Sequence, residues 1–256
     1  MGLLYEEFIK QVFKMTGIDL SAYKENQMKR RISTLMFRHD LSEYSDYLRF
    51  IKESKVAYDE FIDYITINVS EFFRNPQQWN VLEKDIIPLL IKKDFIRVWS
   101  AACSNGEEPY SISMLLRKHV DPKRFRIIAS DIDENALKKA QAGIYAPKSL
   151  ENVPTEFMKY FEVKGECYTV KDEIKQNVSF LKHDLVLDEY LSGIDLLVCR
   201  NVIIYFNEDI KEKVFYRLSK ALNKGGILFL GSTEQIFMPR RFGLEQYRPF
   251  FYKKVE

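Results

Sequence analysis

The sequence contains few cysteine, histidine and glycine residues, and this scarcity excludes several kinds of site. Its three cysteines, Cys103, Cys167 and Cys199, lie far apart and form no CxxC pair, so neither a disulfide framework nor a cysteine-rich zinc site is predicted. The three histidines are equally scattered. We therefore expect no metal site and interpret the cysteines as small buried or half-buried thiols.

Long apolar runs and a strong charge of one sign are also missing. No stretch approaches the roughly 18 apolar residues that span a bilayer, and the N-terminal residues lack the apolar core of a secretory signal. The 39 basic and 37 acidic residues give a formal net charge of +2, which disfavours a globally cationic nucleic-acid-binding protein. We expect a cytoplasmic protein, a monomer, that neither inserts into membranes nor binds nucleic acid.

Residues 1–75 show helical periodicity and no clear strand alternation. The pattern predicts a small all-helical N-terminal domain over this range, with Gly17 ending the first helix and Ser42 capping the third. The predicted helices cover residues 4–17, 24–40, 42–54 and 56–68.

The pattern changes at Phe95, where short β-branched runs begin to alternate with amphipathic stretches. Nearly continuous apolar strands separated by helices predict a doubly wound, mostly parallel α/β sheet in a second domain, residues 76–256. Gly225 and Gly226 are expected to stop the last helix. The predicted strands are 95–101, 125–131, 177–184, 194–200 and 226–232, and the predicted helices are 109–120, 134–143 and 208–224.

Two stretches depart from this alternation. Residues 147–176 are too long for an ordinary connection and include two alternating runs around Lys164-Gly165, which predict an inserted antiparallel β-subdomain with a hairpin. At the C-terminus, "LEQYRPFFYKK" (244–254) contains Pro249 and ends in an aromatic strand. No helix separates this strand from the predicted strand 226–232, so we expect an antiparallel edge to the main sheet.

Polar residues follow the predicted strands where ligands bind in open α/β sheets, beyond the carboxyl ends of the strands. Asp131 ends the second strand, 25 residues after Gly106 (131 − 106), a spacing typical of an acid that accepts the hydroxyl protons of a ribose. Alternatively, this aspartate caps the following helix.

The loop "SAACSNGEEPYS", residues 100–111, indicates which nucleotide-like ligand fits. A pyrophosphate requires several glycines and no fixed negative charge, whereas Glu107 and Glu108 favour a cation. S-adenosylmethionine has a ribose, an ammonium and a sulfonium but no phosphate. We expect Glu108 to face this ligand and Glu107 to favour the helix N-terminus, although both glutamates would also suit the helix dipole alone.

Four segments together resemble the CheR-type chemotaxis receptor glutamate O-methyltransferases: "NVSEFFRNPQQW" (68–79), "VWSAACSNGEEPYSISML" (98–115), "IIASDIDENALKKAQAGIYA" (127–146) and "LVCRNVIIYFN" (197–207). The resemblance implies a class I, Rossmann-like methyltransferase domain. It also implies S-adenosyl-L-methionine as cofactor, with S-adenosyl-L-homocysteine as product. The implied function is to esterify glutamates on the cytoplasmic helical domain of chemoreceptors during sensory adaptation.

The resemblance also implies site residues. Arg74 and Tyr205 match positions proposed to act in methyl transfer. The alternatives are an interdomain salt bridge for Arg74 and a core tyrosine for Tyr205. Three positions depart from the common family pattern: Ser70 stands where threonine is commoner, Asn105 where threonine is frequent, and Asp184 where many members have asparagine. The implied cofactor contacts are Asn68, Ser70, Arg74, Glu108, Asp131, Asp184, Leu185, Arg200 and Asn201.

A basic helix within residues 24–40 predicts either a solvated face or a docking surface. Because methylated receptor segments are acidic helices, we expect Arg30, Arg31 and Arg38 to contribute to receptor docking. Two other functions stay open at this point: a non-catalytic module that binds the cofactor and docks partners, and a methyltransferase with another substrate. Whether the inserted hairpin binds a receptor peptide tether is also open.

Overall fold

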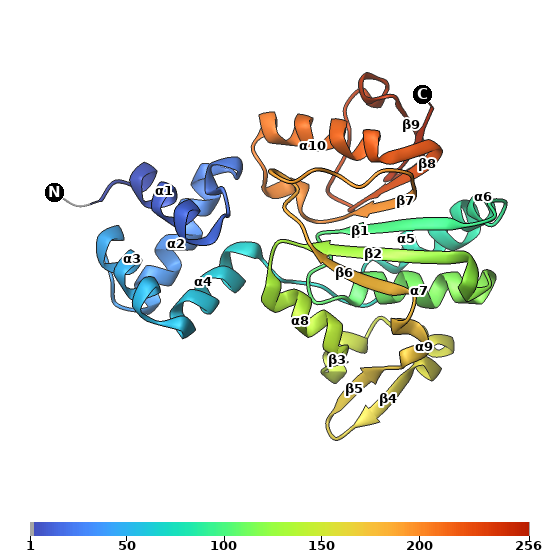
Figure 1. The fold of residues 1–256 in the computed structure, drawn as a ribbon, viewed down its shortest axis with the longest axis horizontal. Helices are drawn as coiled ribbons and strands as arrows, with labels where there is room; N and C mark the ends of the chain where they lie inside the picture. Colours follow the sequence, from blue (N-terminus) through green and yellow to red (C-terminus); the bar gives the residue numbers. More distant parts are fainter. Residues whose placement is uncertain (1–2, 256) are drawn as a thin grey trace. The chain divides into compact units, whose positions relative to one another are not determined.

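A computed structural model describes residues 3–255, and the chain forms two compact units (Figure 1). The first unit comprises the chain up to Asn68 together with Ile204–Lys213. The second comprises Val69–Ile203 and the chain from Val214 onward. Within residues 3–255, no helix is both long and apolar enough to cross a membrane.

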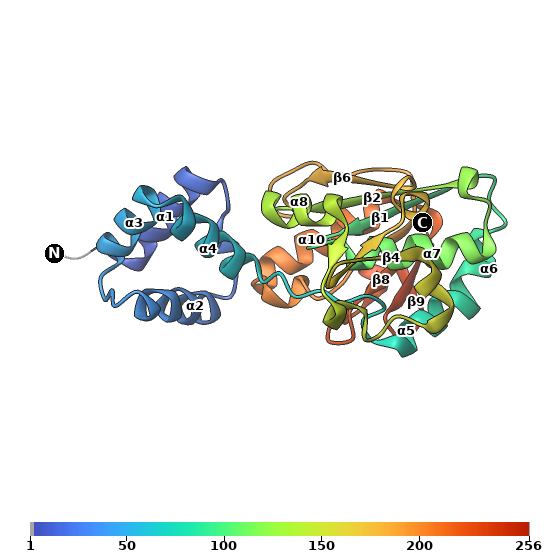
Figure 2. The same ribbon diagram turned by 90° about the horizontal axis from the view of Figure 1, so that it is seen from below.

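The first unit is built from four α-helices, as predicted, and Figure 2 shows them gathered together. Gly17 ends the first helix in the left-handed conformation, φ 76°, which confirms the predicted stop. Ser42 is not the cap of the third helix, because Glu43 occupies that position, and its side chain accepts no capping hydrogen bond. The helices are α1 (Tyr5–Thr16), α2 (Glu25–Arg38), α3 (Tyr44–Glu53) and α4 (Lys55–Thr66).

The segment that precedes α10 (Glu208–Ala221) is paired with the start of α2 inside the first unit. Phe206 forms an isolated antiparallel bridge with Tyr23, and their ring centroids lie 5.3 Å apart. Lys24 N donates to the carbonyl oxygen of Tyr205 at 2.9 Å. The backbone of Tyr205 is therefore fixed by contacts with residues about 180 positions earlier (205 − 24 = 181).

The second unit contains a seven-stranded sheet in the order β6-β2-β1-β7-β8-β10-β9. The first five strands in this order are parallel, and β10 runs antiparallel to both β8 and β9. This confirms the doubly wound, mostly parallel sheet and its antiparallel edge. The strands are β1 (Ile96–Ala101), β2 (Phe125–Asp131), β6 (Val178–Lys182), β7 (Ile194–Cys199), β8 (Leu222–Leu230), β9 (Leu244–Arg248) and β10 (Phe251–Lys254).

One face of the sheet supplies alternate strand residues to a large apolar core. Val98, Ile127 and Val198 are fully buried there, in one cluster with Trp79 and Leu115 from the helices. Burial of such side chains stabilises the fold by about 1.5–3 kcal/mol each. The other helices of this unit and its connections are α5 (Pro76–Val81), a π turn (Leu82–Ile86), α6 (Ile87–Leu90), α7 (Glu107–His119), α8 (Glu134–Ala142) and α9 (Asp172–Lys175).

The prediction that Gly225 and Gly226 stop the last helix is wrong. The helix ends at Ala221, and both glycines lie inside β8. Gly225 adopts φ +76°, and a Cβ atom on Gly226 would lie 2.9 Å from the carbonyl oxygen of Ile194 on the neighbouring strand. The pair therefore permits a strand irregularity and a close approach of two backbones, rather than a helix end.

The insertion forms a three-stranded antiparallel sheet in the order β3-β5-β4, which Figure 1 shows apart from the main sheet. Gly165 has φ +62° in the turn of the β4-β5 hairpin, as the predicted hairpin requires. Phe72 packs edge-on against Tyr145 and Phe161, so this sheet shares the core of the second unit. The strands are β3 (Ile144–Tyr145), β4 (Phe161–Lys164) and β5 (Cys167–Val170).

Candidate cofactor site

The loop between β1 and α7 is tightly folded. Ala102, Ser104 and Gly106 all have positive φ, at 59°, 50° and 93°. A Cβ atom on Gly106 would lie 2.7 Å from the Cβ atom of Ala140 on α8, so only glycine fits. Non-glycine residues in the left-handed region cost free energy and concentrate at functional sites, which makes this loop a candidate site.

Asp131 lies at the carboxyl end of β2 with only 7% of its surface exposed. Its Oδ2 accepts the Ser104 N–H at 2.7 Å, and its Oδ1 accepts the Asp133 N–H at 3.0 Å. Burial raises the pKa of Asp131 to about 6, against the lowering effect of these backbone N–H groups. The carboxylate, with about four lone-pair positions, keeps acceptor capacity for a ligand hydroxyl.

The structure assigns the helix cap to a different aspartate. Asp133 accepts the N–H groups of Asn135 and Ala136, at 2.8 and 3.3 Å, and so caps α8. Asp131 is not the cap residue, and it joins the loop after β1 to the loop after β2. This removes the main alternative to a ligand-binding role for Asp131.

Glu107 and Glu108 are the first two residues of α7, and both side chains contact other segments of the chain. Glu107 is 3% exposed, and its Oε2 accepts a hydrogen bond from the Ser70 hydroxyl. Glu108 accepts from the Ser100 hydroxyl at 2.8 Å and forms a 3.3 Å ion pair with Arg200. Burial raises the pKa of each glutamate. The negative charge of Glu108 is therefore balanced by protein, while Glu107 is held by a neutral hydroxyl.

Arg200, which directly follows β7, is directed at protein acceptors. Its Nη2 donates to the Arg74 carbonyl oxygen at 2.8 Å, to Asn75 Oδ1 at 3.1 Å and to Gln78 Oε1 at 2.7 Å. The guanidinium lies 4.7 Å from the ring centroid of Phe229, and its burial lowers its pKa. Sequence reasoning missed Gln78, because nothing in the sequence marked a glutamine just inside a helix as buried.

The segment that carries Arg74 is anchored by its neighbours. Phe72 and Phe73 are buried, and Phe73 stacks on Phe157 with centroids 5.0 Å apart. The two phenylalanines therefore anchor the segment in the core of the second unit. Arg74 itself is half-buried and donates to the Val69 carbonyl oxygen at 3.0 Å.

The remaining predicted cofactor residues of the second unit lie in loops that follow β6 and β7. Asp184 Oδ1 accepts the Val186 N–H at 2.6 Å, burial raises the pKa of Asp184, and Leu185 is buried. Asn201 adopts φ +60°, and its N–H donates to Glu234 Oε2 at 2.8 Å. Sequence reasoning also missed Glu234, a buried acid in the loop after β8.

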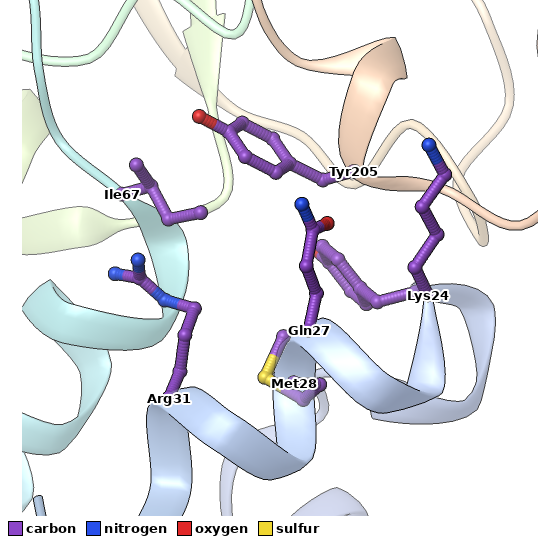
Figure 3. Close-up of a pocket in the computed structure, with 7 residues that line it drawn as sticks. Lys24, Gln27, Met28, Arg31, Ile67 and Tyr205 are labelled. Carbon is purple, nitrogen blue, oxygen red and sulfur yellow. The ribbon is translucent and has the colours of Figure 1, made fainter. Parts of the chain in front are cut away.

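In the first unit, Tyr205 lines a pocket together with Arg31 and Ile67, and Figure 3 shows these three side chains around a common space. The Arg31 guanidinium lies 4.4 Å from the ring centroid of Tyr64 and donates to the Tyr64 carbonyl oxygen. The other lining residues are Tyr23, Lys24, Gln27 and Met28.

Two of the predicted docking arginines, Arg30 and Arg38, are exposed on α2, whereas Arg31 is half-buried. Asn68, at the end of the first unit, donates its amide to Thr66 Oγ1 at 3.0 Å and to Asp63 Oδ1 at 3.3 Å. The three docking arginines and Asn68 therefore all belong to the first unit, whereas the other predicted cofactor residues belong to the second.

The groups in the second unit fit the predicted cofactor. Four carboxylates lie at or beyond the carboxyl ends of β1, β2 and β6, and one of them, Asp131, has acceptor capacity for a ligand hydroxyl. An acidic site with a single loop glycine suits a cationic, hydroxylated ligand and disfavours a pyrophosphate. These carboxylates are Glu107, Glu108, Asp131 and Asp184.

Comparison with known proteins covers both units. Residues 68–251 match the family described as "CheR methyltransferase, SAM binding domain", and residues 4–66 match "CheR methyltransferase, all-alpha domain". A "Chemotaxis protein methyltransferase" of Listeria monocytogenes is 40% identical over 254 residues, covering 98% of this chain and 97% of the relative. A protein of the same name from Borreliella burgdorferi is 32% identical, covering 96% and 92%.

Proposed function

The chain belongs to the CheR methyltransferase family, and we propose that it methylates glutamate side chains on the cytoplasmic helical domain of chemotaxis receptors. Its cofactor is S-adenosylmethionine, which the family's binding domain takes up. The reaction forms a glutamyl methyl ester and S-adenosylhomocysteine. The observation that carries the proposal is the 40% identity to a chemotaxis protein methyltransferase across 98% of this chain.

We assign the ribose hydroxyls to Asp131, whose buried carboxylate retains lone pairs after accepting two backbone N–H groups. Glu108, although paired with Arg200, belongs to the proposed set as an acceptor for the ammonium group, and Glu107 has no cationic partner of its own among the contacts described above. The loops after β6 and β7 supply the other contacts. The proposed residues there are Asp184, Leu185, Arg200 and Asn201; Asn68, Ser70 and Arg74 complete the proposed set.

The bound cofactor supplies an electrophilic methyl group on a positively charged sulfur. A glutamate with a pKa near its usual value of about 4.3 is already ionised at neutral pH, so the chain has no proton to remove. What the protein contributes is orientation of the carboxylate and exclusion of water. We assign the holding of the substrate carboxylate to Arg74 and its orientation by a hydrogen bond to Tyr205.

The test incubates the protein with methyl-labelled S-adenosylmethionine and membranes that contain chemoreceptors. Label should appear on the receptors and be released by mild base, because carboxyl methyl esters hydrolyse under these conditions. Label on nucleic acid, or no transfer by a protein that binds the cofactor, would overturn the proposal. The control is Asp131→Ala, which we expect to lose cofactor binding and transfer together.

A further inference from the structure

The loop that carries Arg200 and Asn201 is held from the far side by one buried carboxylate, Glu234. Glu234 lies in the loop after β8 and is 3% exposed. Its Oε2 accepts the N–H groups of Asn201 and Gly231, both at 2.8 Å. Its Oε1 accepts the N–H groups of Val202 and Ile203, at 3.0 and 2.8 Å.

These four hydrogen bonds use about all the lone-pair positions of one carboxylate. Three consecutive backbone N–H groups converge on it, which is the geometry of an anion-binding nest occupied here by the protein's own side chain. The arrangement also retains Asn201 in the left-handed region, at φ +60°. Without the carboxylate, the loop would keep a strained residue and lose the partners of three N–H groups.

Gly231 completes the arrangement. A Cβ atom at this position would lie 2.6 Å from Glu234 Oε2 and 3.0 Å from the Asn201 nitrogen. A side chain there would therefore push the carboxylate and the Asn201 loop apart. Gly231 and Glu234, three residues apart in one loop, both serve the same close approach to the end of β7.

We propose that Glu234 is a positioning residue for cofactor binding, which acts by fixing the backbone of residues 201–203. Through this backbone it also fixes the start of the loop, where Arg200 contacts Glu108 and the carbonyl oxygen of Arg74. The inference rests on cofactor binding by the second unit and does not depend on which substrate receives the methyl group.

The first test is Glu234→Gln, which keeps the shape but replaces one acceptor oxygen with an amino group that faces two N–H donors. We expect the dissociation constant of S-adenosylhomocysteine, measured by calorimetry, to rise roughly 10-fold. Amide hydrogen exchange should accelerate at residues 201–203. The matched control is Glu245→Gln, an exposed glutamate on β9, which should change neither quantity. In steady-state assays, Glu234→Gln should raise the KM for the cofactor by a larger factor than it lowers kcat.

Two results would overturn the inference. One is wild-type affinity in a folded Glu234→Gln variant, whether or not its amides exchange faster. The other needs no variant: in the wild-type protein, saturating S-adenosylhomocysteine should slow exchange at residues 201–203, because binding favours the fixed loop. Exchange that stays unchanged there, while the loop at 102–106 becomes protected, would show that this backbone is not coupled to the cofactor. Gly231→Ala should weaken binding in the same direction.

Discussion

Asp131 is a buried carboxylate at the end of β2 that accepts backbone N–H groups from two different loops. Its position 25 residues after Gly106 (131 − 106) predicted a ribose acid, with a helix cap as the alternative. The structure assigns the cap to Asp133 and leaves Asp131 bridging two loops. The spacing between the first loop and Asp131 predicts such a residue because the last residue of a parallel strand lies at the edge of the sheet where ligands bind.

Cofactor affinity should fall as Asp131 is protonated. Its pKa of about 6 in the protein means that lowering the pH from 7.5 to 5 converts a doubly accepting carboxylate into a carboxylic acid. We expect the dissociation constant of S-adenosylhomocysteine to rise across this range with a midpoint near 6. Asp131→Asn should bind about tenfold or more weakly at pH 7.5 and should lack this step. Calorimetry over the pH range gives both results, and an equal step in the variant would contradict the assignment.

The same raised pKa predicts the direction of a stability change in the absence of cofactor. Between its ordinary pKa of 3.8 and about 6, the folded protein binds this proton more tightly than the unfolded chain does. The contribution of Asp131 to the free energy of unfolding therefore decreases as the pH rises through this window, by on the order of 3 kcal/mol. Urea unfolding at pH 4.5 and 7.5 should show a smaller loss for Asp131→Asn than for the wild-type protein.

Gln78 and Glu234 mark the limit of sequence reasoning about single residues. Both are buried, and both contact segments more than 30 positions away, Gln78 at Arg200 and Glu234 at residues 201–203. Periodicity and spacing report on local structure, and they carry no information on a side chain that accepts from a distant backbone or guanidinium. The carboxylate–N–H pattern around Glu234 depends on the register of β7 and β8, which only the folded sheet defines.

At the scale of elements, the strands were predictable, whereas two helix ends were predicted wrongly, the start of α3 and the end of α10. Runs such as "IDLLVC" are buried along their whole length in β7, and this continuous burial is what made them readable as parallel strands. The prediction that Gly225 and Gly226 end the last helix was wrong, although glycine commonly follows the last turn of a helix. Here the requirement for glycine came from the close approach of β7 to β8, a tertiary contact.

The buried ion pair between Arg200 and Glu108 joins the end of β7 to the start of α7, and its disruption should be costly. Arg200→Met would leave Glu108 buried without its cation, so we expect a loss of about 3–5 kcal/mol in the free energy of unfolding. Adding Glu108→Gln should recover part of that loss. Urea denaturation of both single variants and the double variant measures the coupling.

A matched control joins two elements at the surface. Lys182 and Glu134 form a 2.7 Å pair with side chains 56% and 59% exposed, and Lys182→Met should cost less than about 1 kcal/mol. Equal costs for Arg200→Met and Lys182→Met would show that burial of the first pair has no energetic consequence. No recovery in the double variant would show that the loss came from packing rather than from the uncompensated charge.

At the scale of the whole molecule, the amino-acid composition excluded classes of protein but did not identify the function. A net charge of +2 disfavoured a general nucleic-acid binder, but it concealed the local basic face of α2. Likewise, Tyr23 pairs with Phe206, and residues 204–213 belong to the first unit, although the predicted N-terminal domain ended at residue 75. Local sequence patterns do not predict backbone pairing between segments that lie this far apart in the chain. Motif order along the chain, by contrast, was sufficient to identify the family.

The proposed receptor docking and the cofactor chemistry should be separable by charge reversal on α2. Arg30→Glu and Arg38→Glu alter exposed side chains of the first unit, whereas the proposed ribose acid lies in the second. Each variant should lower kcat/KM for receptor methylation about fivefold at low salt, the equivalent of roughly 1 kcal/mol, and reduce its dependence on ionic strength. The dissociation constant of S-adenosylhomocysteine should not change.

The control is Lys52→Glu, a charge reversal of the same size at an exposed residue on α3, which should leave both quantities near the wild-type values. If all three reversals slow methylation equally, the effect reflects overall charge rather than a docking surface on α2. If none does, these arginines form only a solvated face.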